Sequence, residues 1–460
     1  MSVPSLVERP VEAVRRSVPT VLPVVVVGGL LFVLLQVSTM STLTAGAAVG
    51  AAGLLFLVAA AGFEGSAVAL LVVGVGLSPL DALHPVPALT FVSVGDLFLL
   101  LGFMALLPVI LGRSLTIDAP FALAAGVLFV VCVGVSVVSD APGASLNSTV
   151  RLVVGALTLP LVFSLWRPGL KIATTLAFAY VVGNNINLVT SFFRGVGDGG
   201  RRIGYSNHPN VMGLAAMLGL ALIPFLLRVM PRQWHWLVCA LGLGCLYGIW
   251  VSGSRAALLV AVAVLALWVL LSRSVAVALT LFGAAIPVFY VVARAYLDGD
   301  RDSGSALGRL FGGGSASASD QARELLARQA WDVFQAHPVL GAGLADVMEA
   351  HNIYLQVAAA VGVVGAAIFV GLLGSVALRA FSLPERATLL VLPVLGYAMV
   401  GVMTTILWDR YVWSVLALPF LVATRNESDP DPGPDAVETA DPVPPRPDRA
   451  LVPSVLRERP

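Results

Sequence analysis

Charged side chains are scarce in this sequence. Of its 460 residues, 12% are charged and 58% are hydrophobic, whereas roughly a quarter of the residues of a soluble domain are charged. This composition excludes an ordinary soluble globular protein and points to the lipid bilayer. The net charge of +1 gives no electrostatic reason to expect a nucleic-acid partner.

Cysteines and familiar catalytic motifs are also scarce. Cys132, Cys239 and Cys245 lie inside apolar runs without metal-ligand spacing, so we interpret them as packing residues. No P-loop, GxSxG or HExxH motif is present. The sequence therefore predicts neither a metal nor a cofactor. A metal-free site that handles phosphate would rely on arginine, whose planar guanidinium stays charged and matches phosphate oxygens with paired hydrogen bonds.

Long apolar runs dominate the chain up to residue 424. About 20 apolar residues span a bilayer, and only helices or closed barrels satisfy the backbone there. The runs are too continuous for the alternating pattern of a barrel strand. We therefore predict an all-α polytopic membrane protein with about 12–14 transmembrane helices. Read separately, the candidate segments are 20–38, 43–61, 66–80, 90–111, 121–138, 150–166, 170–190, 209–228, 234–252, 255–272, 274–297, 351–378, 387–405 and 408–424.

Basic residues in the turns indicate the orientation, because cytoplasmic turns are enriched in Lys and Arg. With the N-terminus inside, the following basic residues all fall in even-numbered turns, which contain few acids: Arg113, Arg167, Lys171, Arg228, Arg232, Arg273, Arg379, Arg386 and Arg425. Both termini are then cytoplasmic, and the 298–350 loop lies outside. We expect the first segment to remain as an anchor, since no small-residue cleavage pattern follows it.

The outer side carries arginines that this bias does not explain: Arg194, Arg201, Arg202, Arg255, Arg301, Arg309, Arg323 and Arg328. We expect a local reason for them. The alternative is a solvated loop whose charges are balanced by Asp198, Asp298, Asp300 and Asp302.

Within the outer loop, "SDQARELLARQAWDVFQAHP" has the pattern of an amphipathic helix, with Ser319 as a plausible N-cap and Pro338 ending it. Glu324 and Arg328 form an i,i+4 pair. An apolar stripe can lie on the membrane or on other helices; its members are Leu326, Ala330, Val333 and Phe334.

His208 and His351 each open a transmembrane helix on the outer face. The partial positive charge of a helix N-terminus disfavours imidazolium, so a histidine there is expected to be neutral and able to accept a proton. A structural capping role is the alternative for both residues.

Four motifs occur in order: "GRRIGYSNHPNVMGLAAML", "SGSRAALLV", "HPVLGAGL" and "AHNIYLQVAAAVGVVGA". Over roughly residues 190–380 this order resembles the O-antigen ligase and O-antigen polymerase family. The resemblance implies a metal-independent glycosyltransferase of the GT-C kind. Such an enzyme moves a glycan from an undecaprenyl diphosphate carrier to a lipid or polysaccharide acceptor on the outer face of the cytoplasmic membrane, for synthesis of cell-envelope polysaccharide.

The resemblance also implies roles for particular residues. His351 matches the family's histidine after the loop, as general base or orienting acceptor, and Arg323 matches the loop-helix arginine. Arg328 stays a candidate for that position because the usual aromatic partner is Ala327 here. The arginine before the HPN motif corresponds to Arg201 or Arg202, and the "SGSR" arginine to Arg255. Asn352 and Gln356 could hydrogen-bond a sugar, or hydrogen-bond between helices instead. The catalytic set is His351, Arg323 and Arg255, and the substrate-binding set is Arg201, Arg202, His208, Asn210, Arg328, Asn352 and Gln356.

The expected organisation has five parts. These are a cytoplasmic N-terminus (1–19), N-terminal transmembrane helices (20–190), the ligase-like core (191–380), C-terminal transmembrane helices (381–424) and a disordered tail rich in Pro and acid (425–460).

The sequence does not separate ligase from polymerase. A transporter or flippase of lipid-linked sugars is the rival from a different class. Transporters usually carry polar groups near the midplane, whereas Asp96, Asn184, Asn185 and Asn187 lie toward the outer ends of their segments. An intramembrane Asp is functional by default, although Asp96 can also pair with an outer arginine.

Overall fold

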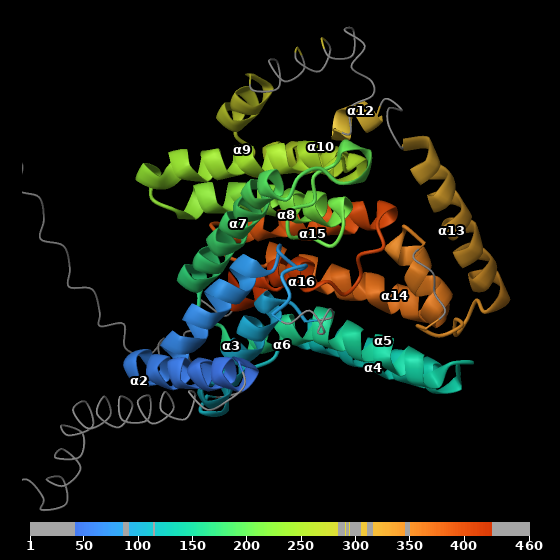
Figure 1. Cartoon of the computed structure of the whole chain (residues 1–460), viewed down its shortest axis with the longest axis horizontal. Coiled ribbons are helices and arrows are strands. Elements are labelled where there is room, and N and C mark those ends of the chain that lie inside the picture. The colour runs from blue at the N-terminus through green and yellow to red at the C-terminus, as the bar shows by residue number, and fades with distance from the viewer. Residues whose placement is uncertain are drawn as a thin grey trace, which may run out of the picture.

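The computed structural model describes residues 42–85, 92–113, 116–283, 290, 294, 305–310, 316–345 and 350–425. Within these ranges the chain is all-helical and contains no strand. Helices α4 (Ala119–Val138), α8 (Pro209–Val229), α10 (Arg255–Ser272) and α14 (Ile353–Phe381) run along the long axis of the molecule, and α13 (Ala316–Ala336) lies across one end of them (Figure 1).

Nine helices in the described part of the chain are long and apolar enough to cross a membrane. The prediction of a polytopic all-α membrane protein is therefore confirmed. The nine are Gly53–Leu77, Val94–Leu111, Ala119–Val138, Pro142–Trp166, Leu170–Phe193, Pro209–Val229, Arg232–Ser252, Arg255–Ser272 and Ile353–Phe381. The expected span 20–38, residues 284–289, 291–293 and 295–297 of the expected span 274–297, the segment 1–19 and the tail after residue 425 lie outside the described residues.

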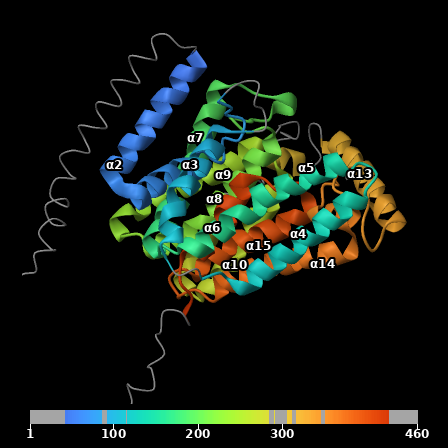
Figure 2. The same ribbon diagram turned by 90° about the horizontal axis from the view of Figure 1, so that it is seen from below.

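The N-terminal helices differ from the expected spans in one place. Segments 43–61 and 66–80 belong to one helix, α2 (Thr42–Leu77), which is interrupted at Gly62 with φ 70° and ψ 176°. A bend inside a helix thus replaces the expected loop, as both views of α2 show (Figures 1 and 2). α3 (Val94–Leu111) returns along α2, and Ser93 and Asp96 form a capping box at its start.

Helix α8 forms the centre of the bundle. Every residue from Val211 to Leu226 is buried, as expected of a helix that is apolar on all sides. It packs against α7 (Leu170–Phe193), α9 (His235–Ser252), α10 and α15 (Val391–Val400).

The C-terminal helices are shorter than expected. The expected segment 387–405 is a helical stretch from Thr388 to Met403, in which 3-10 turns precede and follow α15. In the expected span 408–424, α16 covers only Arg410–Leu416 and a 3-10 turn follows it. These helices are buried inside the bundle, where Tyr397 and Trp413 are completely covered. Segments that are buried in protein are as apolar as segments that span a membrane. Hydropathy alone therefore cannot tell the two apart and overestimated the length of these helices.

Helix α14 is broken near its middle. Val361 and Gly362 leave helical geometry, Gly362 having φ 70°, so the first half of α14 ends at Ala360. The carbonyls of Ala359 and Ala360 accept hydrogen bonds from the backbone of Ala342 and Gly343, each at 2.9 Å. The expected continuous segment 351–378 is therefore two helical pieces, and the "GAGL" turn satisfies the backbone exposed between them.

Helix α13 confirms the predicted amphipathic helix, including the Glu324–Arg328 ion pair. Its start was predicted wrongly, because the helix begins at Ala316 rather than after an N-cap at Ser319. Ala330 packs with Ala350 and Ala359, so the apolar stripe lies against the start of α14.

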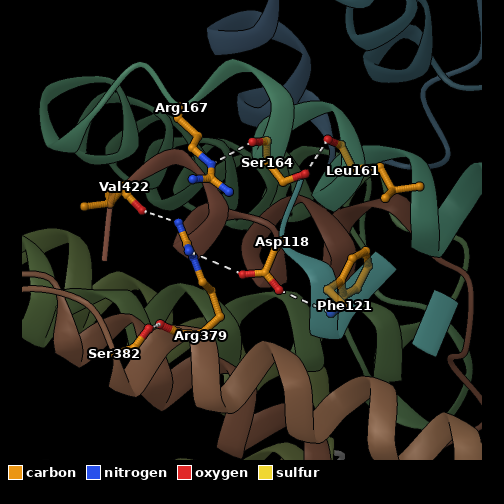
Figure 3. Close-up of polar contacts among 8 residues, drawn as sticks. All are labelled: Asp118, Phe121, Leu161, Ser164, Arg167, Arg379, Ser382 and Val422. Carbon is orange, nitrogen blue, oxygen red and sulfur yellow. Dashed lines mark hydrogen bonds and ion pairs between the residues drawn. The ribbon is translucent and has the colours of Figure 1, made fainter. Parts of the chain in front are cut away.

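Ion pairs tie the other end of the bundle together. Arg379 in α14 lies 3.3 Å from Asp118 and donates to the carbonyl of Val422 at 2.7 Å (Figure 3). Asp118 also caps α4 by accepting from the N–H of Phe121. The Arg379 side chain is 4% exposed, so loss of either partner would leave a buried charge unpaired.

Candidate functional site

A cavity of about 640 Å³ lies at the end of the bundle where α8, α10 and α14 begin. All four sequence motifs contribute to its wall, as do α5 (Pro142–Leu152), α13 and the 400–409 segment. The lining residues are Ser148, Asn207, His208, Asn210, Val211, Leu214, Ser254, Ala256, Arg323, Leu344, Ala345, His351, Gln356, Val400, Met403, Thr404, Thr405, Ile406, Trp408 and Asp409.

The turn between α9 and α10 anchors two arginines. Gly253 adopts a left-handed conformation with φ 66°, which glycine reaches without a steric penalty. The carbonyl of Ser252 accepts from Nε of Arg201 at 2.7 Å, and the carbonyl of Gly253 accepts from Nη1 of Arg309 at 3.0 Å. The "SGSR" motif therefore holds two guanidinium groups by its backbone as well as supplying Arg255.

Four arginines gather beside the cavity. Burial, followed by the charges of Arg309, Arg323 and Arg255, lowers the pKa of Arg201 to about 9. Burial, then the charges of Arg255 and Arg323, lower the pKa of Arg309, and burial, then the charge of Arg255, lowers the pKa of Arg323. Nε of Arg309 and Nε of Arg323 are buried without a hydrogen-bond partner among the described residues. Such a group of like charges with unused donors favours an anion that offers several oxygens.

Only part of this arginine group faces the cavity directly. Arg323 lines it, whereas Arg201 stands behind Asn210, to whose Oδ1 it donates at 2.6 Å. Both Nη atoms of Arg255 bind the carboxylate of Asp320, and Nη1 of Arg323 lies 4.0 Å from the same carboxylate. Arg255 holds the pKa of Asp320 below its usual range. Asp320 thus fastens α13 to the start of α10 and keeps Arg323 at the cavity.

The two outer histidines have different surroundings. His208 is the N-cap of α8, because its Nδ1 accepts from the N–H of Asn210 at 3.1 Å. Burial, then the charges of Arg201 and His351, lower its pKa, which favours the neutral ring. His351 does not cap α14; Asn352 does so by accepting from the N–H groups of Tyr354 and Leu355.

His351 has a strained backbone. It is half-buried, lines the cavity, and has φ 51° in the left-handed region. A side chain other than glycine in that region costs about 1–2 kcal/mol, and such strain gathers at functional sites.

Several residues of the predicted set do not line the cavity. Arg328 pairs with Glu324 on an exposed face of α13. Arg202 donates to the carbonyl of Ser191 at 3.0 Å and lies over the ring of Phe192. Asn352 is the helix cap described above. Where the sequence left pairs open, the geometry thus favours Arg323 over Arg328 and Arg201 over Arg202.

The family comparison agrees with this geometry. Residues 237–370 match the O-antigen ligase family model. This segment is similar to the O-antigen ligase family, which confirms the resemblance over these residues. The apolar helices show that the chain is a membrane protein. A comparison with curated proteins finds no match.

The ligase match covers only part of the cavity. The matched segment contains Arg255, Arg309, Arg323, His351 and Gln356. It does not contain the 201–210 loop, α5 or the 400–409 segment, which also line the cavity. The role of these outer parts therefore rests on their geometry.

Sequence reasoning missed several residues at the cavity. Arg309 was noted as an outer arginine but given no role, although it is 2% exposed. Ser148, Trp408 and Asp409 were absorbed into predicted spans or the gaps between them. Trp408 and Asp409 could have been found from the sequence, because an Asp–Arg pair stands at 409–410 within apolar residues. Acidic residues at membrane depth usually serve a function.

Proposed function

We propose that the chain is a glycosyltransferase that moves a glycan from an undecaprenyl diphosphate carrier to a hydroxyl of a lipid or polysaccharide acceptor. The reaction takes place at the cavity, on the outer face of the cytoplasmic membrane, with both termini inside. The main support is that Arg323 and the strained His351 line one cavity, with three more arginines beside it, and that both residues lie in the segment that matches the O-antigen ligase family.

His351 is the general base in this proposal. It accepts the proton of the acceptor hydroxyl as the oxygen attacks C1 of the first donor sugar. The C1–O bond to the diphosphate breaks, and both electrons leave with the diphosphate. His351 directly precedes the N-cap of α14 and lines the cavity together with Arg323, so the reacting hydroxyl lies between these two side chains in this proposal.

The arginines stabilise the leaving diphosphate. Arg323 contacts it, and Arg201 and Arg309 add positive charge from behind at positions fixed by Ser252 and Gly253. Preorganised donors aimed at developing charge supply a large share of catalysis in other enzymes. Arg255 acts partly through Asp320, which it shares with Arg323. His208 and Asn210 complete the phosphate side, and Gln356 faces the sugar. Asn352 positions His351.

A polymerase of the same family uses the same donor chemistry and remains a second candidate. A flippase is less favoured, because the polar groups expected to line its path have structural partners. Asn184 and Asn185 donate to backbone carbonyls, and Asn187 donates to Ser206 at 2.8 Å. Asp96 pairs with Arg410.

The test is transfer by the purified protein in nanodiscs, with a lipid-linked glycan fraction as donor, measured by release of undecaprenyl diphosphate. We expect turnover in EDTA, since arginines replace a metal. Arg323→Ala is expected to abolish turnover. The turnover of Arg323→Lys should also be much lower than that of wild type, because the point charge of lysine does not reproduce the paired hydrogen bonds of a guanidinium group. Arg328→Ala, on the same helix but exposed, is the matched control.

Three outcomes would count against the proposal. These are recovery of EDTA-treated protein only after addition of a divalent cation, an active Arg323→Ala variant, and movement of the lipid-linked glycan across vesicles without release of diphosphate.

A further inference from the structure

The cavity has a second wall, opposite in character to the arginine group. It is formed by Ser148 on α5, Gln356 on α14, and the non-helical segment 404–409, which contributes Thr404, Thr405, Trp408 and Asp409. We call these six residues the polar–aromatic wall. It combines one indole with hydroxyl, amide and carboxylate groups.

The segment that carries Trp408 is rigidly placed. The hydroxyl of Tyr397 donates to the carbonyl of Ile406 at 2.7 Å, and Nε1 of Trp413 donates to the carbonyl of Leu407 at 2.9 Å. Both donor residues are fully buried. The segment is therefore held from beneath by the core.

A rare helix irregularity accommodates this segment. Val153–Leu157 form a π-helical turn between α5 and α6 (Thr158–Trp166). Within it, Gly155 lies so close to Trp408 that an added Cβ would be 1.9 Å from the Trp408 carbonyl oxygen. π-Turns are uncommon and frequently mark functional sites. Here the turn and the glycine allow Trp408 to reach the cavity.

Gln356 has an unused acceptor. Its side chain is 6% exposed, and its Oε1 has no hydrogen-bond partner among the described residues. Gln356 also lines a second small cavity together with Trp408. Buried polar atoms are nearly always paired, because an unpaired one costs about 1–3 kcal/mol. An unpaired amide beside a cavity is therefore suited to a ligand that brings a hydrogen-bond donor.

We propose that the polar–aromatic wall binds a sugar ring next to the diphosphate, with the ring against Trp408 and its hydroxyls on Gln356, Asp409 and the threonines. This assignment rests on the proposed function and names its sugar subsite. Polar groups placed beside an aromatic ring can fix the orientation of a small molecule in a pocket. The ring belongs either to the first sugar of the donor or to the terminal sugar of the acceptor.

The experiment measures binding of three probes to the full-length protein in nanodiscs. The first probe is a lipid-linked glycan fraction, the second is undecaprenyl diphosphate without sugar, and the third is the oligosaccharide released from the first by mild acid. The variants are Trp408→Ala, Trp408→Phe and Gln356→Leu. Trp236→Ala, an exposed tryptophan on α9 outside the cavity lining, is the control.

We expect Trp408→Ala and Gln356→Leu to lower the affinity for a sugar-bearing probe about tenfold. Their affinity for sugar-free undecaprenyl diphosphate should change less than twofold. Trp408→Phe should retain part of the affinity, because it keeps an aromatic face and the fold. Weakened binding of the lipid-linked glycan assigns the wall to the donor sugar. Weakened binding of the released oligosaccharide alone assigns it to the acceptor.

Wild-type affinity of the variants for both sugar-bearing probes would overturn the inference, as would equal weakening of all three probes. The proposed function fails differently. In that case Arg323→Ala would bind undecaprenyl diphosphate as tightly as wild type, whatever the Trp408 variants do.

Discussion

Replacing His351 by glycine should separate the stability of the protein from its activity. The left-handed backbone of His351, with φ 51°, is unfavourable for histidine and accessible to glycine. Relief of this strain should raise the free energy of unfolding by about 1–2 kcal/mol. The greater entropy of glycine in the unfolded chain should lower it again by about 0.5–1 kcal/mol. The variant is therefore expected to unfold at the same temperature as wild type or slightly higher.

The turnover of the His351 variants, in contrast, should decrease. A general base contributes roughly 10²–10⁴-fold, which corresponds to about 3–5 kcal/mol of activation free energy. We expect His351→Gly and His351→Asn to lose turnover by this factor and to retain binding of undecaprenyl diphosphate, which the arginines hold.

His208→Asn is the matched control, because asparagine also caps helices well and the substitution should cost at most about 1 kcal/mol. The assays are thermal unfolding and turnover of each variant in one lipid system. Near wild-type turnover of His351→Gly would refute the assignment of the base. A parallel loss of stability and turnover would show instead that His351 holds the site together.

Three further predictions follow from other parts of the molecule. Ser317→Cys, exposed at the start of α13, should react with an impermeant thiol reagent in intact cells; labelling only after lysis would reverse the proposed orientation. Gly362→Ala should destabilise the protein by more than about 2 kcal/mol, because the added Cβ would lie 1.9 Å from a carbonyl oxygen, whereas Gly371→Ala has open space and should be silent in thermal unfolding. Gly155→Ala should displace Trp408 and weaken binding of lipid-linked glycan, and an unchanged affinity would contradict the role of the π-turn.

Hydropathy located the long helices well, including α8, which is buried on all sides. A membrane span and a helix buried in protein share an apolar composition. The segment 408–424 was therefore predicted as a full span although α16 is short, and the break in α14 at Gly362 was not anticipated. Its signal was the glycine in "AVGVVGA" after a glycine-rich turn, but only the contact with that turn shows why the helix must open there.

The sequence identified the arginine group but could not choose between close neighbours. Arg201 has an extended backbone, with φ −94° and ψ 144°, and successive side chains on extended backbone point to opposite sides. Arg201 thus reaches Asn210 while Arg202 turns to Phe192. Arg323 and Arg328 lie on different faces of α13, and the choice depended on which face packs on α14. These decisions come from tertiary contacts that neither charge nor spacing encodes.

The interrupted helices explain how a membrane bundle can contain a site of this kind. Backbone outside a regular helix is tolerated at membrane depth only where protein covers it or where it lines a cavity. The break in α14 is covered by the "GAGL" turn, the π-turn after α5 is covered by Trp408, and the 404–409 segment lines the cavity itself. The 404–409 segment brings Trp408 and Asp409 to the cavity, and the π-turn makes room for the backbone of Trp408. The residues hardest to find from the sequence are therefore those that the irregular backbone positions, and the sugar subsite is proposed where they meet.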